Sequence, residues 1–269
     1  MDIATKFRIA PGARAHLSRR DPADRSAFAD RKAAEKQSEK DVAAIDELQD
    51  RLYAEGKRAL LVVLQGIDTA GKDGTIRHVF KETSPLGAVV TPFRQPSEQE
   101  LAHDFLWRAH LACPRRGFIG IFNRSHYEAV LVERVRKLAP AREIEARYAQ
   151  INAFEKILAD NGTTILKFML HISKDEQRER LQDRLDKTKS RWKFNPADLD
   201  DRKLWNTYME SYELALEHCS TAWAPWHVIP ADHKWARNAA IAAIVRATLE
   251  KMNPQYPKPK WKPKDFKVV

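Results

Sequence analysis

The segment with the clearest capacity for chemistry is a glycine-rich stretch, GIDTAGKDGT, at residues 66–75. Glycine lets the backbone approach an anion, and amides at a helix N-terminus donate hydrogen bonds to phosphate oxygens. The spacing from Gly66 to Lys72 fits the Walker A pattern of phosphate-binding loops, although Asp73 stands where that pattern has Ser or Thr. We therefore predict a phosphate-binding loop that consists of Gly66, Ala70, Gly71, Lys72, Asp73, Gly74 and Thr75.

A phosphate-binding loop without that hydroxyl residue needs another ligand for its metal ion. Asp68 inside the loop and Thr75 one turn later are the nearest oxygen ligands. A hard cation prefers oxygen, so we expect Mg²⁺, or Mn²⁺ in its place, with Asp68 as a ligand. The alternative interpretation is a glycine-rich turn in some other α/β protein.

A second polar segment, NRSHYE, begins at Asn123 directly after the apolar run IGIF. A metal-binding carboxylate normally follows a strand at this point, whereas an amide brings no charge. Arg124 offers planar, forked donors to a transferring phosphoryl group. Glu128 is the candidate for the missing carboxylate and thus a second metal ligand. Its alternative role is to complement the dipole of a helix that we expect to start here. We expect His126 to be structural.

A strongly basic stretch lies further along the chain. Five basic side chains and one acidic side chain fall between Arg184 and Lys193, and Trp192 and Phe194 are interleaved with them. Phosphoryl-transfer enzymes place a lid at this point of the chain, and closure of a lid excludes water as a competing acceptor. We predict a lid over about residues 175–196. A solvated helix face is the alternative.

The elements that must position these residues alternate between strands and helices. Apolar runs predict five strands at residues 59–64, 88–91, 119–122, 164–170 and 226–230, with helices at about 32–53, 72–83 and 142–160 among the connections. This pattern indicates an α/β fold: a three-layer sandwich with a five-stranded parallel sheet, helices on both faces and a helical lid. The glycine-rich loop, the Pro92–Pro96 loop and the Asn123 segment each follow a strand, so they should meet at one edge of the sheet.

The composition of the chain indicates which class of partner it binds and in which cellular compartment it works. The 269 residues include 47 Lys and Arg and 37 Asp and Glu, for a formal net charge of +10, which suggests a polyanionic partner: nucleic acid, an anionic membrane or polyphosphate. Cys113 and Cys219 have no metal or redox spacing, and no apolar run approaches ~20 residues. We expect a cytoplasmic protein with three parts: an arm (1–29), a phosphotransferase domain (30–252) and a basic, Pro-rich tail (253–269).

Three separated motifs, in order, carry a family resemblance. They are GxDxxGKDGT from Gly66, FNRSHYE from Phe122 and RWKF from Arg191. Together they resemble the type 2 polyphosphate kinase family over roughly Phe28 to Met252. The resemblance implies a P-loop kinase-like fold with a mobile lid, and transfer of a phosphoryl group from inorganic polyphosphate to nucleotides with magnesium.

The same resemblance assigns residues. It implies that Asp68 and Lys72 serve the metal and the phosphates. Asn123, Arg124 and Glu128 then form the transfer centre, and the lid contributes Arg178, Arg184, Arg191 and Lys193. Commoner branches of the family have Asp at position 123 and Asn at position 128. The chain is similar instead to the class III branch, which uses both AMP and ADP. Some relatives in that branch carry Asp where this chain has Ala129, so Asp68 gains importance here.

The predicted function is therefore a polyphosphate-dependent nucleotide kinase that forms ADP and ATP, in a reaction that could run in either direction. Adenine nucleotides are the expected acceptors, with guanine nucleotides as an option, and the long helix at 32–53 suits a homo-oligomer. We expect no membrane or nucleic-acid partner. The alternatives are an ATP-dependent nucleoside monophosphate kinase of the same fold and a nucleic-acid-binding protein with a vestigial phosphate loop.

Overall fold

The structure is a computed structural model that describes residues 3–262 and 266–268. Five strands form one parallel sheet in the order β2-β3-β1-β4-β5. The strands are β1 (Ala59–Gln65), β2 (Ala88–Pro92), β3 (Ile119–Asn123), β4 (Thr163–His171) and β5 (Trp226–Pro230). All five predicted strands are therefore present, and β1 lies at the centre of the sheet.

The central strand explains the uninterrupted apolar run of the sequence. Every residue of β1 is buried, because the strand is paired on both sides and covered on both faces. Leu60, Val62 and Leu64 pack into the core on one face, whereas Leu61 and Val63 pack into the core on the other. Successive residues of β1 thus point alternately into the hydrophobic cores on the two faces of the sheet, so neither face of the strand is polar.

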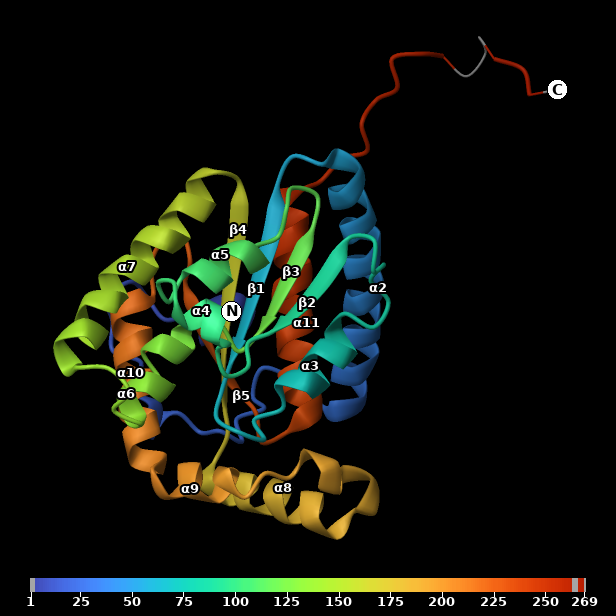
Figure 1. The fold of residues 1–269 in the computed structure, drawn as a ribbon. Coiled ribbons are helices and arrows are strands. Elements are labelled where there is room, and N and C mark those ends of the chain that lie inside the picture. Colours follow the sequence, from blue (N-terminus) through green and yellow to red (C-terminus); the bar gives the residue numbers. More distant parts are fainter. Residues whose placement is uncertain (1–2, 263–265, 269) are drawn as a thin grey trace.

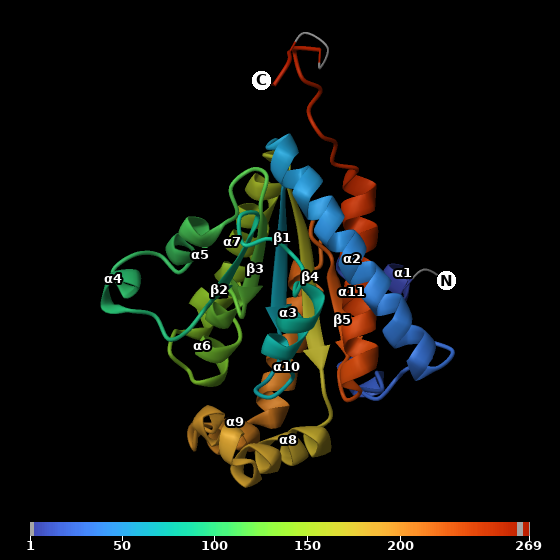
Figure 2. The same cartoon turned by 90° about the vertical axis from the view of Figure 1, so that its right-hand side faces the viewer.

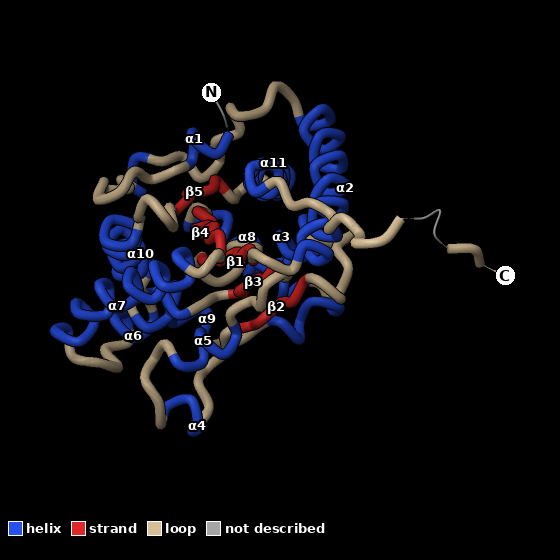
Figure 3. Tube along the Cα trace, turned by 90° about the horizontal axis from the view of Figure 1, so that it is seen from above, coloured by secondary structure: helices blue, strands red, loops and turns tan. Residues whose placement is uncertain are grey.

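Helices cover both faces of the sheet and give the molecule three layers (Figures 1, 2 and 3). One face carries α2 (Arg31–Glu55), α3 (Lys72–Val79) and α11 (Lys234–Met252). The other carries α5 (Trp107–Ala112), α6 (Val132–Val135), α7 (Ala141–Asp160) and α10 (Trp205–Cys219). The predicted α/β fold, a sandwich with a five-stranded parallel sheet and helices on both faces, is confirmed by this arrangement.

The carboxyl ends of the strands meet at one edge of the sheet. There α8 (Lys174–Asp186), the 3₁₀ helix η3 (Thr188–Lys193) and α9 (Ala197–Lys203) lie across the strand ends (Figure 1). The loop after β2 leads to α4 (Glu98–Leu101), which begins with a capping box between Ser97 and Glu100. The connections that follow β1, β2 and β3, together with residues 174–203, therefore surround the edge of the sheet at which the strands end.

Two predicted helices differ in the structure. Helix α3 ends at Val79 rather than near Thr83, because the Thr83 hydroxyl donates to the Phe80 carbonyl and the Ser84 amide donates to Gln49. The helix expected from Asn123 is instead a 3₁₀ turn, η2 (His126–Ala129), followed by α6. The backbone first continues its pairing with β1, since the Arg124 amide donates to the Leu64 carbonyl.

The described N-terminal and C-terminal segments lie in different parts of the molecule (Figures 1 and 2). Residues 3–30 include α1 (Ile3–Phe7) and the 3₁₀ helix η1 (Leu17–Arg19), and the Ile9 amide donates to the Trp226 carbonyl of β5. The tail leaves α11 at the end of the molecule opposite α8 (Figures 1 and 2). Pro263 and Lys264 of the predicted tail lie outside the described residues. The division into arm, domain and tail stays a prediction.

Candidate active site

The glycine-rich loop connects the end of β1 to the start of α3. Gly71 caps α3 with a φ of 103°, in the left-handed region that favours glycine. A Cβ atom at Gly66 would lie 2.9 Å from the Cβ atom of Ala70 and 3.0 Å from the Leu170 carbonyl oxygen, so no larger residue fits there. The two glycines thus allow the tight turn that aims the loop and the helix N-terminus at one point.

Lys72 is buried at the first position of α3. Its Nζ donates to the Gly66 carbonyl at 2.6 Å and to the Ile67 carbonyl at 3.4 Å, so the ammonium group folds back over its own loop. Burial, together with the positive charge of Arg124, lowers the pKa of Lys72 to about 8. Carbonyl oxygens are the present acceptors of this ammonium group, and phosphate oxygens are stronger ones.

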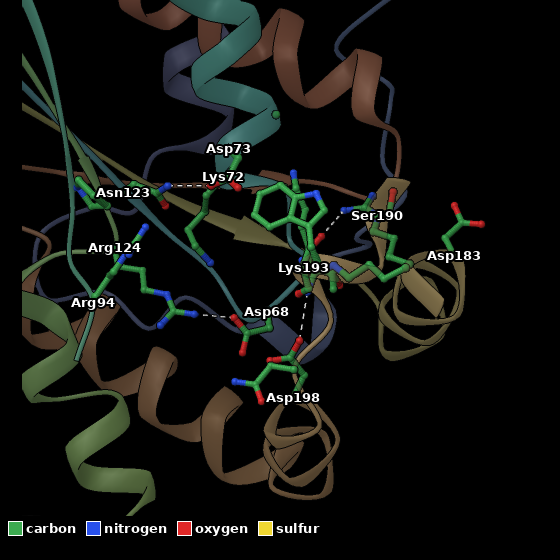
Figure 4. A pocket seen from close by; sticks show the side chains of 18 of the residues that line it. Asp68, Lys72, Asp73, Arg94, Asn123, Arg124, Asp183, Ser190, Lys193 and Asp198 are labelled. Carbon is green, nitrogen blue, oxygen red and sulfur yellow. Dashed lines mark hydrogen bonds and ion pairs between the residues drawn. The ribbon is translucent and has the colours of Figure 1, made fainter. Parts of the chain in front are cut away.

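The segment after β3 faces the loop across the end of the sheet. Asn123 Nδ2 donates to Asp73 Oδ1 at 2.7 Å, and an Arg124 terminal nitrogen donates to Asp68 Oδ1 at 2.6 Å (Figure 4). Burial opposes the charge of Arg124, yet Glu128 and Asp68 raise the pKa of this arginine above its usual value. Arg124 is also held at a φ of 60°, a strained conformation of the kind that clusters at functional sites.

Glu128 lies in the 3₁₀ turn rather than on an α-helix. Its Oε1 accepts a hydrogen bond from Gln65 Nε2 at 3.0 Å, and its Oε2 lies 3.9 Å from an Arg124 terminal nitrogen. The predicted catalytic residues Asp68, Lys72, Asn123, Arg124 and Glu128 are therefore brought together at the ends of β1 and β3.

A large basic cavity opens beside this cluster, with a volume of about 890 Å³. We call it the cationic cavity, because eight basic and four acidic side chains are among its lining residues. The basic residues are Lys72, Arg94, Arg124, Arg180, Arg184, Lys193, Lys234 and Arg237. Gly71, Asp73 and Gly74 of the loop also line it, and Figure 4 shows the side chains of most of its lining residues.

A second cavity of about 470 Å³ adjoins the first, and we call it the apolar cavity. Its walls include Leu101, Leu131, Val132, Leu138, Tyr208 and Tyr212. Glu128 lines this cavity as well. Both cavities share Asp68, Arg94, Gln95 and Arg124, so these four residues form the boundary between a basic space and an apolar one.

The lid residues named from the sequence divide into two pairs. Arg184 and Lys193 line the cationic cavity, and Arg184 pairs with Asp198 at 3.1 Å. Arg178 and Arg191 do not line it in this conformation: Arg178 lies 3.7 Å from Asp175, and Arg191 donates to the Leu185 carbonyl. The assignment of Arg178 and Arg191 to the donor phosphates stays a prediction.

Of the remaining loop residues, Gly66 and Ala70 shape the turn without lining the cationic cavity. Thr75 is fully buried, its hydroxyl has no hydrogen-bond partner, and it lines neither large cavity. Asp68 is thus better placed than Thr75 to meet an incoming cation.

The oxygen donors of the site fit a hard divalent ion. Within residues 3–262 and 266–268, no group of three or more His, Cys, Asp or Glu side chains could by itself hold a metal. Magnesium suits such a site, because it commonly takes one or two carboxylates and completes its shell with water and substrate phosphates. Asp68, on the wall between the cavities, and Glu128 beside it are two carboxylates placed for that role.

Several lining residues were not identified from the sequence. Tyr208 and Tyr212 come from α10, Arg180 from the buried side of α8, and Lys234 and Arg237 from the first turn of α11. Lys234 and Arg237 could have been predicted from the sequence, because they follow the predicted strand β5. The carboxyl end of β5 lies at the same edge of the sheet as the phosphate loop.

The fold, the phosphate loop and the flanking arginine and carboxylates define a phosphotransferase of the P-loop kinase-like class. Residues 28–257 match the family model described as Polyphosphate kinase 2 (PPK2), and the chain belongs to this family. The match confirms the family resemblance predicted over roughly Phe28 to Met252 and extends slightly beyond it.

Relatives of known sequence and structure agree with this family. The chain is 52% identical over 259 residues to an AMP/ADP-polyphosphate phosphotransferase of Meiothermus ruber, covering 94% of this chain and 96% of that protein. It is 42% identical over 228 residues to an ADP-polyphosphate phosphotransferase of Rhodopseudomonas palustris, covering 80% and 79%. The crystal structure of polyphosphate kinase 2 from Arthrobacter aurescens TC1 superposes with a TM-score of 0.95 at 39% identity, covering 98% of this chain and 95% of that one.

Proposed function

We propose that the chain transfers the terminal phosphoryl group of inorganic polyphosphate to AMP and to ADP, forming ADP and ATP. The observation that carries this proposal is the meeting of two unlike cavities at Asp68 and Arg124. A phosphoryl group passes between two substrates, and each substrate needs a space that matches its own chemistry. The family membership of the chain and the activity for which the Meiothermus ruber relative is named support the same substrates.

The cationic cavity suits the donor. A chain of condensed phosphates carries a negative charge on every unit and needs an extended basic surface, whereas one nucleoside triphosphate needs a single pocket. The cavity extends from Arg124 across the phosphate loop to Lys234 and Arg237. This extent favours polyphosphate over ATP as the donor.

The apolar cavity suits the acceptor. A nucleobase is flat and apolar on its faces, and the aromatic rings of Tyr208 and Tyr212 together with Leu131 offer a matching surface. Arg94 and Arg108 also line this cavity and can meet the phosphates of the acceptor. With its base in the apolar cavity, the nucleotide would point its phosphate toward Arg124.

The chain's own side chains can then carry out the transfer. An oxygen of the acceptor phosphate attacks the terminal phosphorus, the bond to the bridging oxygen breaks, and the shortened polyphosphate leaves with that electron pair. Arg124 would exchange its carboxylate partner for the equatorial oxygens, and Lys72 would exchange the Gly66 carbonyl for the donor phosphates. The acceptor phosphate is already ionised, so the step needs no general base.

We further propose that Mg²⁺, or Mn²⁺ in its place, is held by Asp68 with Glu128 nearby. A bound divalent ion supplies neutralisation of charge on the phosphate oxygens. Asp68 and Glu128 have to release Arg124 in part to serve the ion, which frees the arginine for the phosphoryl group.

Turnover without any added triphosphate tests the proposal. Purified protein incubated with AMP, long-chain polyphosphate and Mg²⁺ should form first ADP and then ATP, measured by ion-exchange chromatography. A Lys72→Met variant, prepared identically, controls for contaminating kinases. Transfer that requires added ATP as donor would instead identify a nucleoside monophosphate kinase. Salt-sensitive oligonucleotide binding without turnover would indicate a vestigial loop. Homo-oligomerisation stays a prediction that light scattering can test.

A further inference from the structure

A buried arginine that the sequence motifs do not include lies directly against the phosphate loop. Arg237, in the first turn of α11, is only 2% exposed and yet lines the cationic cavity. A Cβ atom built on Gly71 would lie 1.9 Å from an Arg237 terminal nitrogen. The guanidinium thus occupies the space that the missing side chain of Gly71 leaves open, beside the N-terminus of α3.

The hydrogen-bond partners of this guanidinium are neutral oxygen atoms. It donates to the Ala70 carbonyl and to Asn238 Oδ1, and no carboxylate pairs with it in the part of the chain that the structure describes. Burial and the nearby positive charge of Arg180 lower the pKa of Arg237 to about 9. An unpaired buried cation destabilises a folded protein, so its presence here needs a reason other than stability.

Arg180 shows the contrast. It is also buried, but its guanidinium donates to the carbonyls of Thr69, Ala70, Ala231 and Asp232, and it pairs with Glu176 at 2.7 Å. Arg180 therefore joins the loop to the end of β5, and its guanidinium donates five hydrogen bonds to other protein groups. Arg237 donates three, so it retains N–H groups that can donate to a ligand. Lys234, three residues earlier on the same helix, lines the same cavity.

We propose that Arg237, with Lys234, is a phosphate-binding subsite for the part of the polyphosphate chain that lies beyond the transferred group. The subsite rests on the proposed function, since its ligand is the proposed donor. Neither residue lines the apolar cavity, so the nucleotide does not reach them from that space. The donor would lie over the phosphate loop, with its reacting end at Arg124 and its body against the first turn of α11.

Substitution of Arg237 by methionine separates this role from a structural one. Removing an uncompensated charge should leave the melting temperature of the ligand-free protein unchanged or higher, because the Ala70 carbonyl keeps its bond from Arg180. The increase in melting temperature caused by added polyphosphate should shrink by at least half. The KM for polyphosphate should rise at least tenfold, while the KM for ADP changes less than twofold.

Two further variants make the outcome decisive. Arg180→Met, the matched control, should lower the melting temperature of the free protein by several degrees, because it leaves buried carbonyls unpaired. Arg237→Lys keeps a cation and should retain part of the polyphosphate effect even if Arg237→Met folds poorly. A KM for polyphosphate within twofold of wild type in Arg237→Lys and Arg237→Met, or an equal rise in both substrates' KM values, would overturn the proposal. The thermal shift needs no turnover, so a wild-type protein that binds polyphosphate without transferring it would refute the proposed function alone.

Discussion

Replacement of Lys167 by methionine should destabilise the protein severely, although this residue contacts no substrate cavity. Lys167, on β4, is completely buried, and its Nζ donates to Tyr127 Oη, to Glu155 Oε2 and to the Cys219 carbonyl at 2.5–2.7 Å. Glu155, on α7, is equally buried, and His126 and Tyr127 bond to its other oxygen. The pair thus anchors the turn that carries Glu128, and His126 has the structural place predicted for it.

The size of the effect follows from the burial of both partners. Breaking a buried ion pair by removing one member costs about 3–5 kcal/mol, because the other charge is left uncompensated. A chain of this length loses about 2 °C of melting temperature per kcal/mol, which gives a fall of about 6–10 °C for Lys167→Met. The double variant Lys167→Met/Glu155→Gln, which removes the stranded charge and keeps an acceptor for Tyr127, should recover at least half of this loss.

The loss of stability in Lys167→Met should depend on pH in a predictable direction. Burial alone would raise the pKa of Glu155, but Lys167 and His126 reverse this and hold that pKa below its ordinary value in the wild type. The contribution of ionised Glu155 to the free energy of unfolding of the wild type is therefore present at neutral pH and is lost as the pH falls through this pKa. Without Lys167, burial should raise the pKa, so the folded variant binds a proton that the unfolded chain has released. The gap in melting temperature between variant and wild type should then be larger at pH 8 than at pH 5. A gap below 2 °C at pH 8, or a double variant no more stable than the single one, would refute the reasoning.

Three further predictions concern activity. Lys72→Met should reduce transfer by about 10²–10³-fold with no loss of melting temperature, and activity within tenfold of wild type would exclude Lys72 from the mechanism. Glu128→Asn should impair use of AMP more than use of ADP in initial-rate assays, whereas an equal loss on both would contradict the branch assignment. The kcat/KM for polyphosphate should decline above about pH 8, because Lys72 of the free enzyme loses its proton as the pH rises through its pKa. The alkaline limb of kcat should lie at higher pH, since bound phosphate favours the charged amine; coincident limbs would argue against this assignment.

How much the sequence predicts depends on how local the determinant is. The phosphate loop is specified within ten residues by two glycines, a lysine and the preceding apolar strand, so its position in the fold could be predicted. The choice between Arg178 and Arg180 could not. Helix α8 carries charged residues all around, so no apolar stripe indicates which arginine faces inward, and the structure buries Arg180 while Arg178 stays exposed.

Long-range contacts account for what else was missed. Arg237 touches the loop from a helix more than 160 residues further along the chain, and only the order of the strands brings the two together. The early end of α3 and the 3₁₀ turn at Glu128 have the same origin. Hydrogen bonds that the Ser84 amide donates to Gln49 and the Arg124 amide donates to Leu64 of β1 compete there with helix formation, and neither acceptor is a sequence neighbour.

The most direct test of the two-cavity arrangement is a crystal structure with AMP, Mg²⁺ and a methylene-bridged polyphosphate that cannot be cleaved. The terminal phosphoryl group is predicted to lie within hydrogen-bond distance of Arg124 and the amides of residues 66–74. The remainder of the chain should run toward Arg237, and the adenine should occupy the apolar cavity. Polyphosphate bound elsewhere, with the loop empty, would contradict the central claim.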